Sequence, residues 1–213
     1  MPRETVSNSA LKERTASAAI SAAVGLLLLT AHPGALALTG VLPAIWLRQS
    51  SRSAAYGTAC AYYAAATWSL IPVVHGFNGS FALGFLIWAG ATITLSLPWL
   101  AFHSIKIERA FWCGALAMLA SVLPPLGLMG VACPISAAGL LFPVFKIVGL
   151  FAACMLPGLL AWKPKPAFLF ASAAILLANV RYAAESPRHV DWEGVDTVAD
   201  ATPGAFGDYR ESN

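Results

Sequence analysis

Residues 54–102 read AAYGTACAYYAAATWSLIPVV, HGFNGS and FALGFLIWAGATITLSLPWLAF, and these two apolar runs with their short connection decide the fold class. Each run has the roughly 20 residues that a helix needs to cross a hydrocarbon core about 30 Å thick. Arg48 and Arg52 precede the first run, and Lys106 and Arg109 follow the second. Lys and Arg mark loops that stay in the cytoplasm. We therefore expect two membrane-spanning helices whose connection lies outside.

The same alternation runs along the whole chain. The basic connections hold Arg3, Lys12 and Arg14, then Arg48 and Arg52, then Lys106 and Arg109, then Lys163 and Lys165. Those between them, around His32-Pro33, His75 to Gly79 and Val131 to Pro134, contain no Lys or Arg. The pattern predicts about seven spans with the amino terminus in the cytoplasm. They are a hairpin within Ala16 to Leu47 broken at His32-Pro33-Gly34, then Ala54 to Val74, Phe81 to Phe102, Phe111 to Gly130, a span within Ile135 to Trp162, and Ala167 to Ala183.

Composition favours the same class. Hydrophobic residues make up 58% of the 213 residues and charged residues 11%, whereas a soluble domain is about a quarter charged. The net charge of +3 is spread over separate loops, which argues against a nucleic-acid footprint. Four tryptophans are expected in the headgroup layer at inner ends of spans, and Trp68 and Trp88 between helices. The four are Trp46, Trp99, Trp112 and Trp162.

The chain divides into a cytoplasmic arm (1–15), an all-α transmembrane domain (16–183) and a short periplasmic tail (184–213) that holds seven of the ten acidic residues. The expected location is the bacterial inner membrane. One alternative is open for the beginning, because residues 1–37 also resemble a cleaved secretory signal. The apolar sequence continues to Trp46, which favours retention as a hairpin.

Lys146 lies inside the sixth predicted span, and two interpretations are open. An ionisable group within the bilayer is usually functional. Alternatively, the proline-bracketed stretch Pro134 to Pro143 forms an outer half-helix or re-entrant segment, and Lys146 reaches the outer headgroups; we favour this second interpretation. Residues at this outer rim or in contact with lipid are then Pro134, Ser136, Pro143, Lys146 and, in another outer connection, His75.

Catalytic residues, cofactors and metals are not expected. His75 has no second ligand at helical spacing, and the cysteines Cys60, Cys113, Cys133 and Cys154 are expected to be small apolar side chains in a helix bundle. Cys133 alone falls in an outer connection. Glu108 lies inside and Cys133 outside, so the two cannot share a proton, which needs hydrogen-bond reach.

Four motifs resemble the membrane portion of TraB-type conjugal transfer proteins of bacterial plasmids. They are Leu42-Pro-Ala-Ile-Trp46, Leu123-Pro-Pro-Leu-Gly127, Pro134-Ile-Ser-Ala-Ala-Gly-Leu-Leu-Phe-Pro143 and Trp192-Glu-Gly-Val-Asp-Thr197. That family is similar to apolipoprotein N-acyltransferase, in which a membrane domain precedes a nitrilase-like catalytic domain. The resemblance implies an inner-membrane component of a conjugal transfer system, with membrane lipid and other transfer subunits as partners and no direct binding of nucleic acid.

The resembled family's catalytic Glu, Lys and Cys belong to the nitrilase-like domain, and none maps onto a position of this chain. Residues 184–213 resemble the lead-in to that domain, so we expect a truncated protein or separate membrane half without enzymatic activity. The other functions considered are a small transporter or channel and a structural subunit of a transfer complex. A transporter requires polar residues converging at mid-membrane.

Overall fold

The computed structural model describes residues 8–30, 33–104, 107–124, 126–127, 132–143, 145–162 and 164–185. Every regular element within these ranges is a helix, which confirms the expected all-α class for the part of the chain that is described. The expected tail from residue 186 onward lies outside these ranges, as do His32, Lys106 and Lys163.

The first apolar block does break near Pro33, as expected. Helix α1 spans Asn8–Leu27 and is followed by the 3-10 turn η1 (Leu28–Thr30). The second limb of the expected hairpin is two short helices, α2 (Pro33–Leu38) and α3 (Val41–Leu47). Neither is long enough to cross a bilayer by itself.

The expected span from Ala54 to Val74 is divided into α4 (Arg52–Ala66) and α5 (Leu70–Asn78). The Thr67 hydroxyl donates to the Tyr63 carbonyl at 2.7 Å, a back-bond that competes with regular helix and bends it. Gly79 ends α5 with a left-handed φ of 68°. The Ser80 side chain then caps α6 (Phe81–Ala101), which matches the fourth expected span.

The later elements differ more from expectation. Helix α7 (Ile107–Ala120) ends before Pro124, so it covers only part of the expected span from Phe111 to Gly130. A 3-10 turn η3 (Pro134–Ser136) and α8 (Ala137–Leu141) form the proline-bracketed stretch, and α9 starts only at Lys146 (Lys146–Trp162). This confirms a separate short helical segment before the sixth apolar run. The last helix, α10, spans Pro164–Glu185.

Seven spans are not supported by the helix lengths. Among the described residues, α6 is the single helix that is both long and apolar enough to cross a membrane, and the body of the protein buries little of it. Helix α1 has 20 residues but carries Lys12, Glu13 and Arg14. The expectation assumed one continuous helix per apolar run, whereas the turns after Ala66 and Ala120 interrupt two of them.

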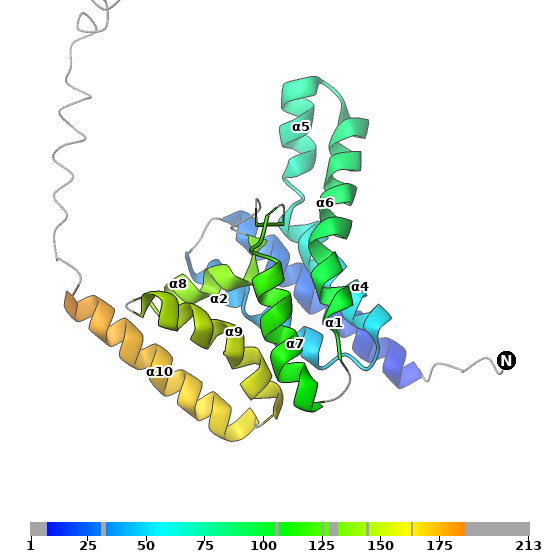
Figure 1. Ribbon diagram of the computed structural model, residues 1–213. Coiled ribbons are helices and arrows are strands. Elements are labelled where there is room, and N and C mark those ends of the chain that lie inside the picture. Colours follow the sequence, from blue (N-terminus) through cyan, green and yellow to red (C-terminus); the bar gives the residue numbers. More distant parts are fainter. Residues whose placement is uncertain are drawn as a thin grey trace, which may run out of the picture.

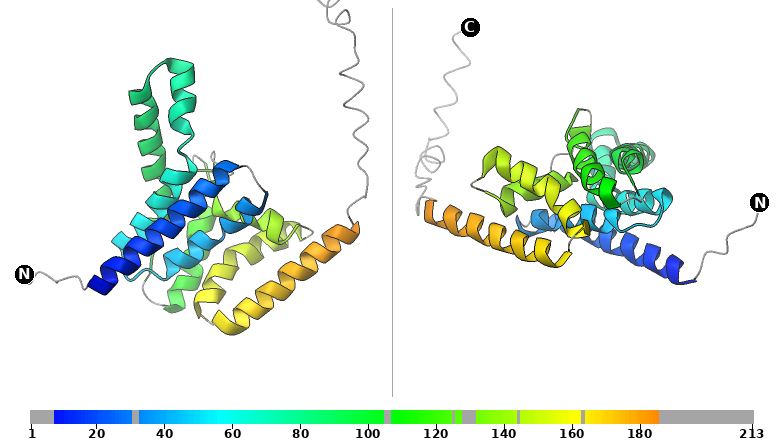
Figure 2. Two further views of the ribbon diagram at one scale, coloured as in Figure 1. Left: turned by 180° about the vertical axis from the view of Figure 1, so that it is seen from behind. Right: turned by 60° about the horizontal axis from the view of Figure 1, so that its bottom comes forward.

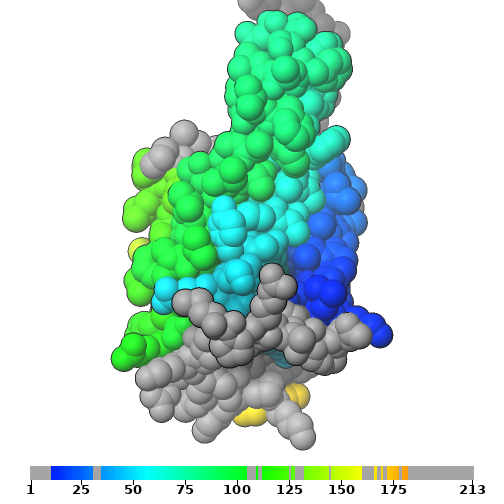
Figure 3. Space-filling model, turned by 90° about the vertical axis from the view of Figure 1, so that its right-hand side faces the viewer, coloured from blue at the N-terminus to red at the C-terminus, as the bar shows by residue number. Residues whose placement is uncertain are grey.

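The helices form a body from which one hairpin projects. In the body α1 packs on α4, α7 on α9 and α4 on α6, and α10 lies along α9 at one edge (Figure 1). Helix α5 and the first half of α6 rise from the body as a separate column, which is visible from behind (Figure 2) and in the space-filling view (Figure 3).

Two of the four tryptophans expected in the headgroup layer lie in the core. Trp46 and Trp99 are both fully buried, with ring centroids 5.2 Å apart in an edge-to-face arrangement. The Trp46 Nε1–H donates to the Trp99 carbonyl at 2.9 Å, and the Trp99 Nε1–H donates to the Tyr63 hydroxyl at 3.1 Å. Partners within the protein satisfy both indoles, so neither needs the headgroup layer. Trp112 is 61% exposed, and its headgroup position stays a prediction.

Candidate functional site

The connection 132–136, which contains the start of the resembled proline-bracketed motif, is held by side chains from distant elements. The Tyr62 hydroxyl of α4 donates to the Ala132 carbonyl at 2.9 Å. The Thr39 hydroxyl, between α2 and α3, donates to the Leu36 carbonyl at 2.6 Å and also lies 3.2 Å from the Pro134 carbonyl. Buried carbonyls need such partners, so these bonds fix where α8 begins.

Cys133 lies in the same connection and is buried. Its Sγ is 3.2 Å from the Ser121 hydroxyl. Burial raises the pKa of the Cys133 thiol, so the sulfur stays protonated at neutral pH and is a poor nucleophile. The four cysteines are all free thiols. Cys133 therefore behaves as a small apolar packing residue, which is what the sequence predicts for the cysteines of this chain.

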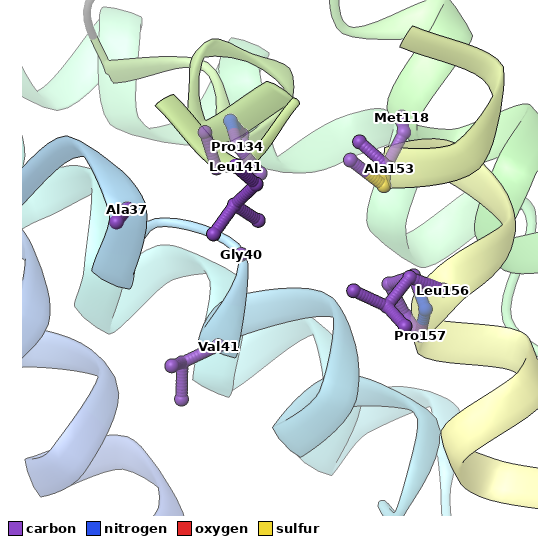
Figure 4. Close-up of a pocket in the computed structure, with 10 residues that line it drawn as sticks. Ala37, Gly40, Val41, Met118, Pro134, Leu141, Ala153, Leu156 and Pro157 are labelled. Atoms are coloured by element: carbon purple, nitrogen blue, oxygen red, sulfur yellow. The ribbon is translucent and has the colours of Figure 1, made fainter. Parts of the chain in front are cut away.

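An apolar pocket of about 100 Å³ lies beside α8. Figure 4 shows lining side chains from the α2–α3 turn, α7, α8 and α9 that face one another across it. The pocket is smaller than the roughly 150 Å³ apolar cavity known to stay dry and bind benzene, so it suits a short hydrocarbon group. The lining residues are Ala37, Gly40, Val41, Met118, Pro134, Ala137, Leu141, Ala153, Leu156 and Pro157.

A second apolar cavity, of about 150 Å³, lies between the α8–α9 connection, α9 and α10. Phe142 and Phe145 of the connection, Val148 and Gly149 of α9 and Ala174 of α10 are among its lining residues. Among the described residues, neither cavity is lined by an ionisable side chain. Both can hold hydrocarbon, and their described walls offer no group for acid–base chemistry.

The structure places four of the five candidate rim residues along one stretch. Pro134 is buried in the wall of the first pocket. The Ser136 hydroxyl donates to the Cys133 carbonyl at 2.7 Å, so it closes its own turn. Pro143 is half-buried between α8 and α9.

Lys146 and His75 occupy different settings. Lys146 is exposed as the first residue of α9 and has an unusual φ of 45°, which supports its expected position at the beginning of the sixth apolar helix. His75 is on α5 in the projecting hairpin, where its ring stacks on Phe81 with centroids 3.7 Å apart. It does not join the other four residues. Lipid contact by these residues stays a prediction.

Most residues that line the first pocket are not predicted by any pattern in the sequence. Gly40, Met118, Leu156 and Pro157 come from three separate elements. They resemble the other apolar residues around them, so no pattern in the sequence marks them. Only Pro134 and its neighbours in the resembled motif gave a signal.

Two of the basic connections expected on the cytoplasmic side lie next to each other. His103, after α6, donates from Nε2 to the carbonyl of Gln49, between α3 and α4, at 3.2 Å. Arg48 and Arg52 flank Gln49 and are exposed. Arg109, in the first turns of α7, is also exposed, while Lys165 is in α10 and its side chain is outside the described part. Their adjacency is consistent with the expectation that these connections lie on the same side of a membrane.

His103 makes the stability of this junction sensitive to pH. Burial lowers the pKa of His103, and Arg52 lowers it further, although the bond to Gln49 raises it. Its Nδ1 is buried without a hydrogen-bond partner among the described residues, so a proton there would be unsatisfied. The unfolded chain therefore binds more protons just below pH 6.5, the ordinary histidine pKa. We expect the free energy of unfolding to fall as the pH drops through that value and to be insensitive to His103 above it.

Thermal unfolding in mild detergent, followed by circular dichroism between pH 7.5 and 5, measures this dependence. His103→Gln keeps a donor toward Gln49 but does not titrate, so the fall in stability should shrink. Ser50→Gln, at an exposed position of the same junction, is the control and should leave the fall unchanged. An equal pH dependence in wild type and His103→Gln would contradict the assignment.

Within the described ranges, no group of three or more His, Cys, Asp or Glu side chains is placed to hold a metal ion.

Two curated proteins are similar to this chain. "Probable conjugal transfer protein TraB" of Sinorhizobium fredii is 32% identical over 168 residues, which cover 76% of this chain and 42% of that protein. "Conjugal transfer protein TraB" of Agrobacterium fabrum is 26% identical over 203 residues, which cover 85% of this chain and 48% of that protein. The chain thus spans less than half the length of each relative.

No family model and no solved structure matches the chain. The similarity to apolipoprotein N-acyltransferase stays a prediction. The two curated relatives support a TraB-like family for this chain.

Proposed function

We propose that the chain is the membrane domain of a TraB-like protein and serves as an integral inner-membrane component of a plasmid conjugal transfer system. The observation that carries the proposal is the 32% identity to the conjugal transfer protein of Sinorhizobium fredii across 76% of this chain. The similarity extends over 168 residues, so the two proteins share more than a local motif.

Three features support the membrane location. Helix α6 has the length and composition of a spanning helix. Large apolar side chains are exposed on α5, α6, α9 and α10, with Phe77 86% and Leu169 70% exposed. A soluble monomer rarely leaves such surfaces in water. Lipid is therefore the first partner, and other transfer subunits are the second.

The orientation follows from the charges. The exposed Arg48, Arg52 and Arg109 sit at connections that the positive-inside rule assigns to the cytoplasm. The α5–α6 turn around Gly79 then faces the periplasm, and so does the chain after α10.

The role is tested by an in-frame deletion of the coding sequence in its host, followed by measurement of plasmid transfer to a recipient strain. We expect the transfer frequency to fall and to be restored by the wild-type gene supplied in trans. An unchanged frequency would overturn the role in transfer.

Membrane location and orientation are tested separately with reporters fused after Gly79 and after Arg109. Alkaline phosphatase, active only in the periplasm, should be active at Gly79 and inactive at Arg109, and a green fluorescent protein should give the opposite result. Phosphatase inactive at both positions would contradict the membrane topology while leaving the transfer experiment valid.

A further inference from the structure

Most of the surface of the projecting hairpin is left uncovered by the other described residues. We define the hairpin arm as residues 70–91, which comprise α5 and the first half of α6. Helix α5 has no buried residue, and Gly84 alone is buried in the α6 half of the arm. Figures 1 and 3 show this arm rising clear of the body. The second half of α6, by contrast, is anchored in the body by buried residues such as Leu95 and Trp99.

Apolar exposure runs around the arm and is not confined to one face. Phe85, Leu86 and Ile87 are consecutive and are 53%, 68% and 42% exposed. Consecutive helical residues are about 100° apart, so these three cover about 200° of the circumference of α6. Phe77 adds 86% exposure from α5. A folded protein partner covers one face of a helix, whereas acyl chains can cover all of its exposed sides.

The dimensions of the arm match one leaflet. The nine residues of α5 rise about 14 Å and the eleven of the α6 half about 16 Å, close to half of a hydrocarbon core about 30 Å thick. No Asp, Glu, Lys or Arg occurs from residue 53 to residue 105. The polar side chains of the arm gather at its tip, where His75 stacks on Phe81 beside the Asn78-Gly79-Ser80 turn. Polar and aromatic groups favour the headgroup layer.

Contacts within the hairpin arm and at its base hold its two helices together. A Cβ on Gly84 would lie 2.7 Å from the Ile71 carbonyl oxygen, so the two helices are in direct backbone contact. At the base, the Trp88 Nε1–H donates to the Ala64 carbonyl at 2.8 Å, and Trp88 packs edge-to-face on Trp68 at 5.6 Å. The arm therefore needs no docking event to order it.

We propose that the hairpin arm stands in a single leaflet, with lipid acyl chains around its exposed circumference and its tip in the outer headgroup layer. The choice of leaflet rests on the proposed membrane orientation; the contact with acyl chains rests on the exposure, length and lack of charge of the arm. The arm thereby acts as a lipid-facing column.

Spin-label accessibility in vesicles of phosphatidylethanolamine and phosphatidylglycerol tests the proposal. Full-length protein with its four cysteines replaced by alanine receives single cysteines at Phe85, Leu86, Ile87 and Phe77, and at Ser50 as a water-exposed control. Oxygen partitions into the lipid phase, whereas a nickel chelate stays in water. We expect spin labels at positions 85–87 to collide more often with oxygen than with the nickel chelate. Position 77 should be intermediate, and position 50 should show the reverse order.

Two results would overturn the proposal. Access by the nickel chelate at all of positions 85–87 would put the arm in water. Shielding of one of the three from both reagents would identify a protein partner on that face. Neither result bears on the transfer experiment, so failure of this inference is distinguishable from failure of the proposed function.

A charge substitution in the arm also tests its contact with lipid, and it can be used if the cysteine-free chain does not fold. Leu86→Lys in the wild-type background should reduce the fraction of protein recovered in vesicles, since a lysine among acyl chains is costly. Ser50→Lys should leave this fraction unchanged. Equal recovery of the two variants would contradict contact between the arm and lipid.

Discussion

Replacing Trp46 with alanine is expected to lower the free energy of unfolding by about 3–5 kcal/mol, the usual cost of truncating a buried aromatic residue. Trp46 is fully buried and joins α3 to the end of α6. Its ring meets Trp99 at 5.2 Å and His103 at 5.3 Å, both edge-to-face. The substitution also leaves the Trp99 carbonyl without the Trp46 donor. A buried unpaired acceptor costs about 1–3 kcal/mol, and part of this cost is already included in the free-energy range given for truncation.

Thermal unfolding in mild detergent, followed by circular dichroism, should show a midpoint lowered by about 6–20 °C for a chain of this size. Trp112→Ala is the matched control, because Trp112 is 61% exposed and surface substitutions usually stay within about 0.5 kcal/mol. Equal effects of the two substitutions would mean that Trp46 is not in the core, and would restore the headgroup position predicted from its place at a span end.

Gly25→Ala is expected to destabilise the protein by about 1–3 kcal/mol, the range for overpacking a tight interface. A Cβ at Gly25 would lie 2.4 Å from the Tyr62 carbonyl oxygen and 3.0 Å from the Ala66 nitrogen. Both atoms belong to the backbone of α4, so no side-chain rotation relieves the clash. Helices α1 and α4 must move apart, and the Tyr62 hydroxyl bond to Ala132 moves with them.

Gly57→Ala on α4 is the control for this substitution. A Cβ at Gly57 meets nothing within 4 Å, so alanine should raise the free energy of unfolding by up to about 1 kcal/mol through its helix propensity. The opposite signs are the diagnostic result, and chemical unfolding of both variants in one detergent measures them. Stabilisation by Gly25→Ala would show that α1 and α4 do not approach so closely.

Local signals in the sequence mark where several helices begin and end. Pro33 and Gly34 are the first residues of α2, and Gly79 adopts the left-handed conformation that closes α5. Ser80 caps α6 through a bond from the Leu83 amide at 3.3 Å. These signals depend on residues within one turn of each other, so they can be read without knowing the fold.

Other boundaries could not be read in this way. The expected third span is divided because the Thr67 hydroxyl bonds back to Tyr63, and a threonine in an apolar run also occurs in unbroken helices. Helix α7 ends at Ala120, and the Ser121 hydroxyl then donates to the Met118 carbonyl at 2.7 Å while contacting Cys133. That contact joins residues twelve positions apart, so the end of α7 depends on where the following connection lies.

The amino-acid sequence by itself determined the helical class, the breaks at Pro33 and Gly79 and the alternation of charged connections. Tertiary structure alone decided that Trp46 and Trp99 are core residues, that the backbone of α4 lies directly against Gly25 of α1, and that Phe85 to Ile87 are left uncovered. The physical reason is the uniform composition of the helices. A polar face opposite an apolar one marks the buried side of a soluble helix, whereas helices such as α6 are apolar on all sides. Only contacts between distant segments then distinguish packed from open faces.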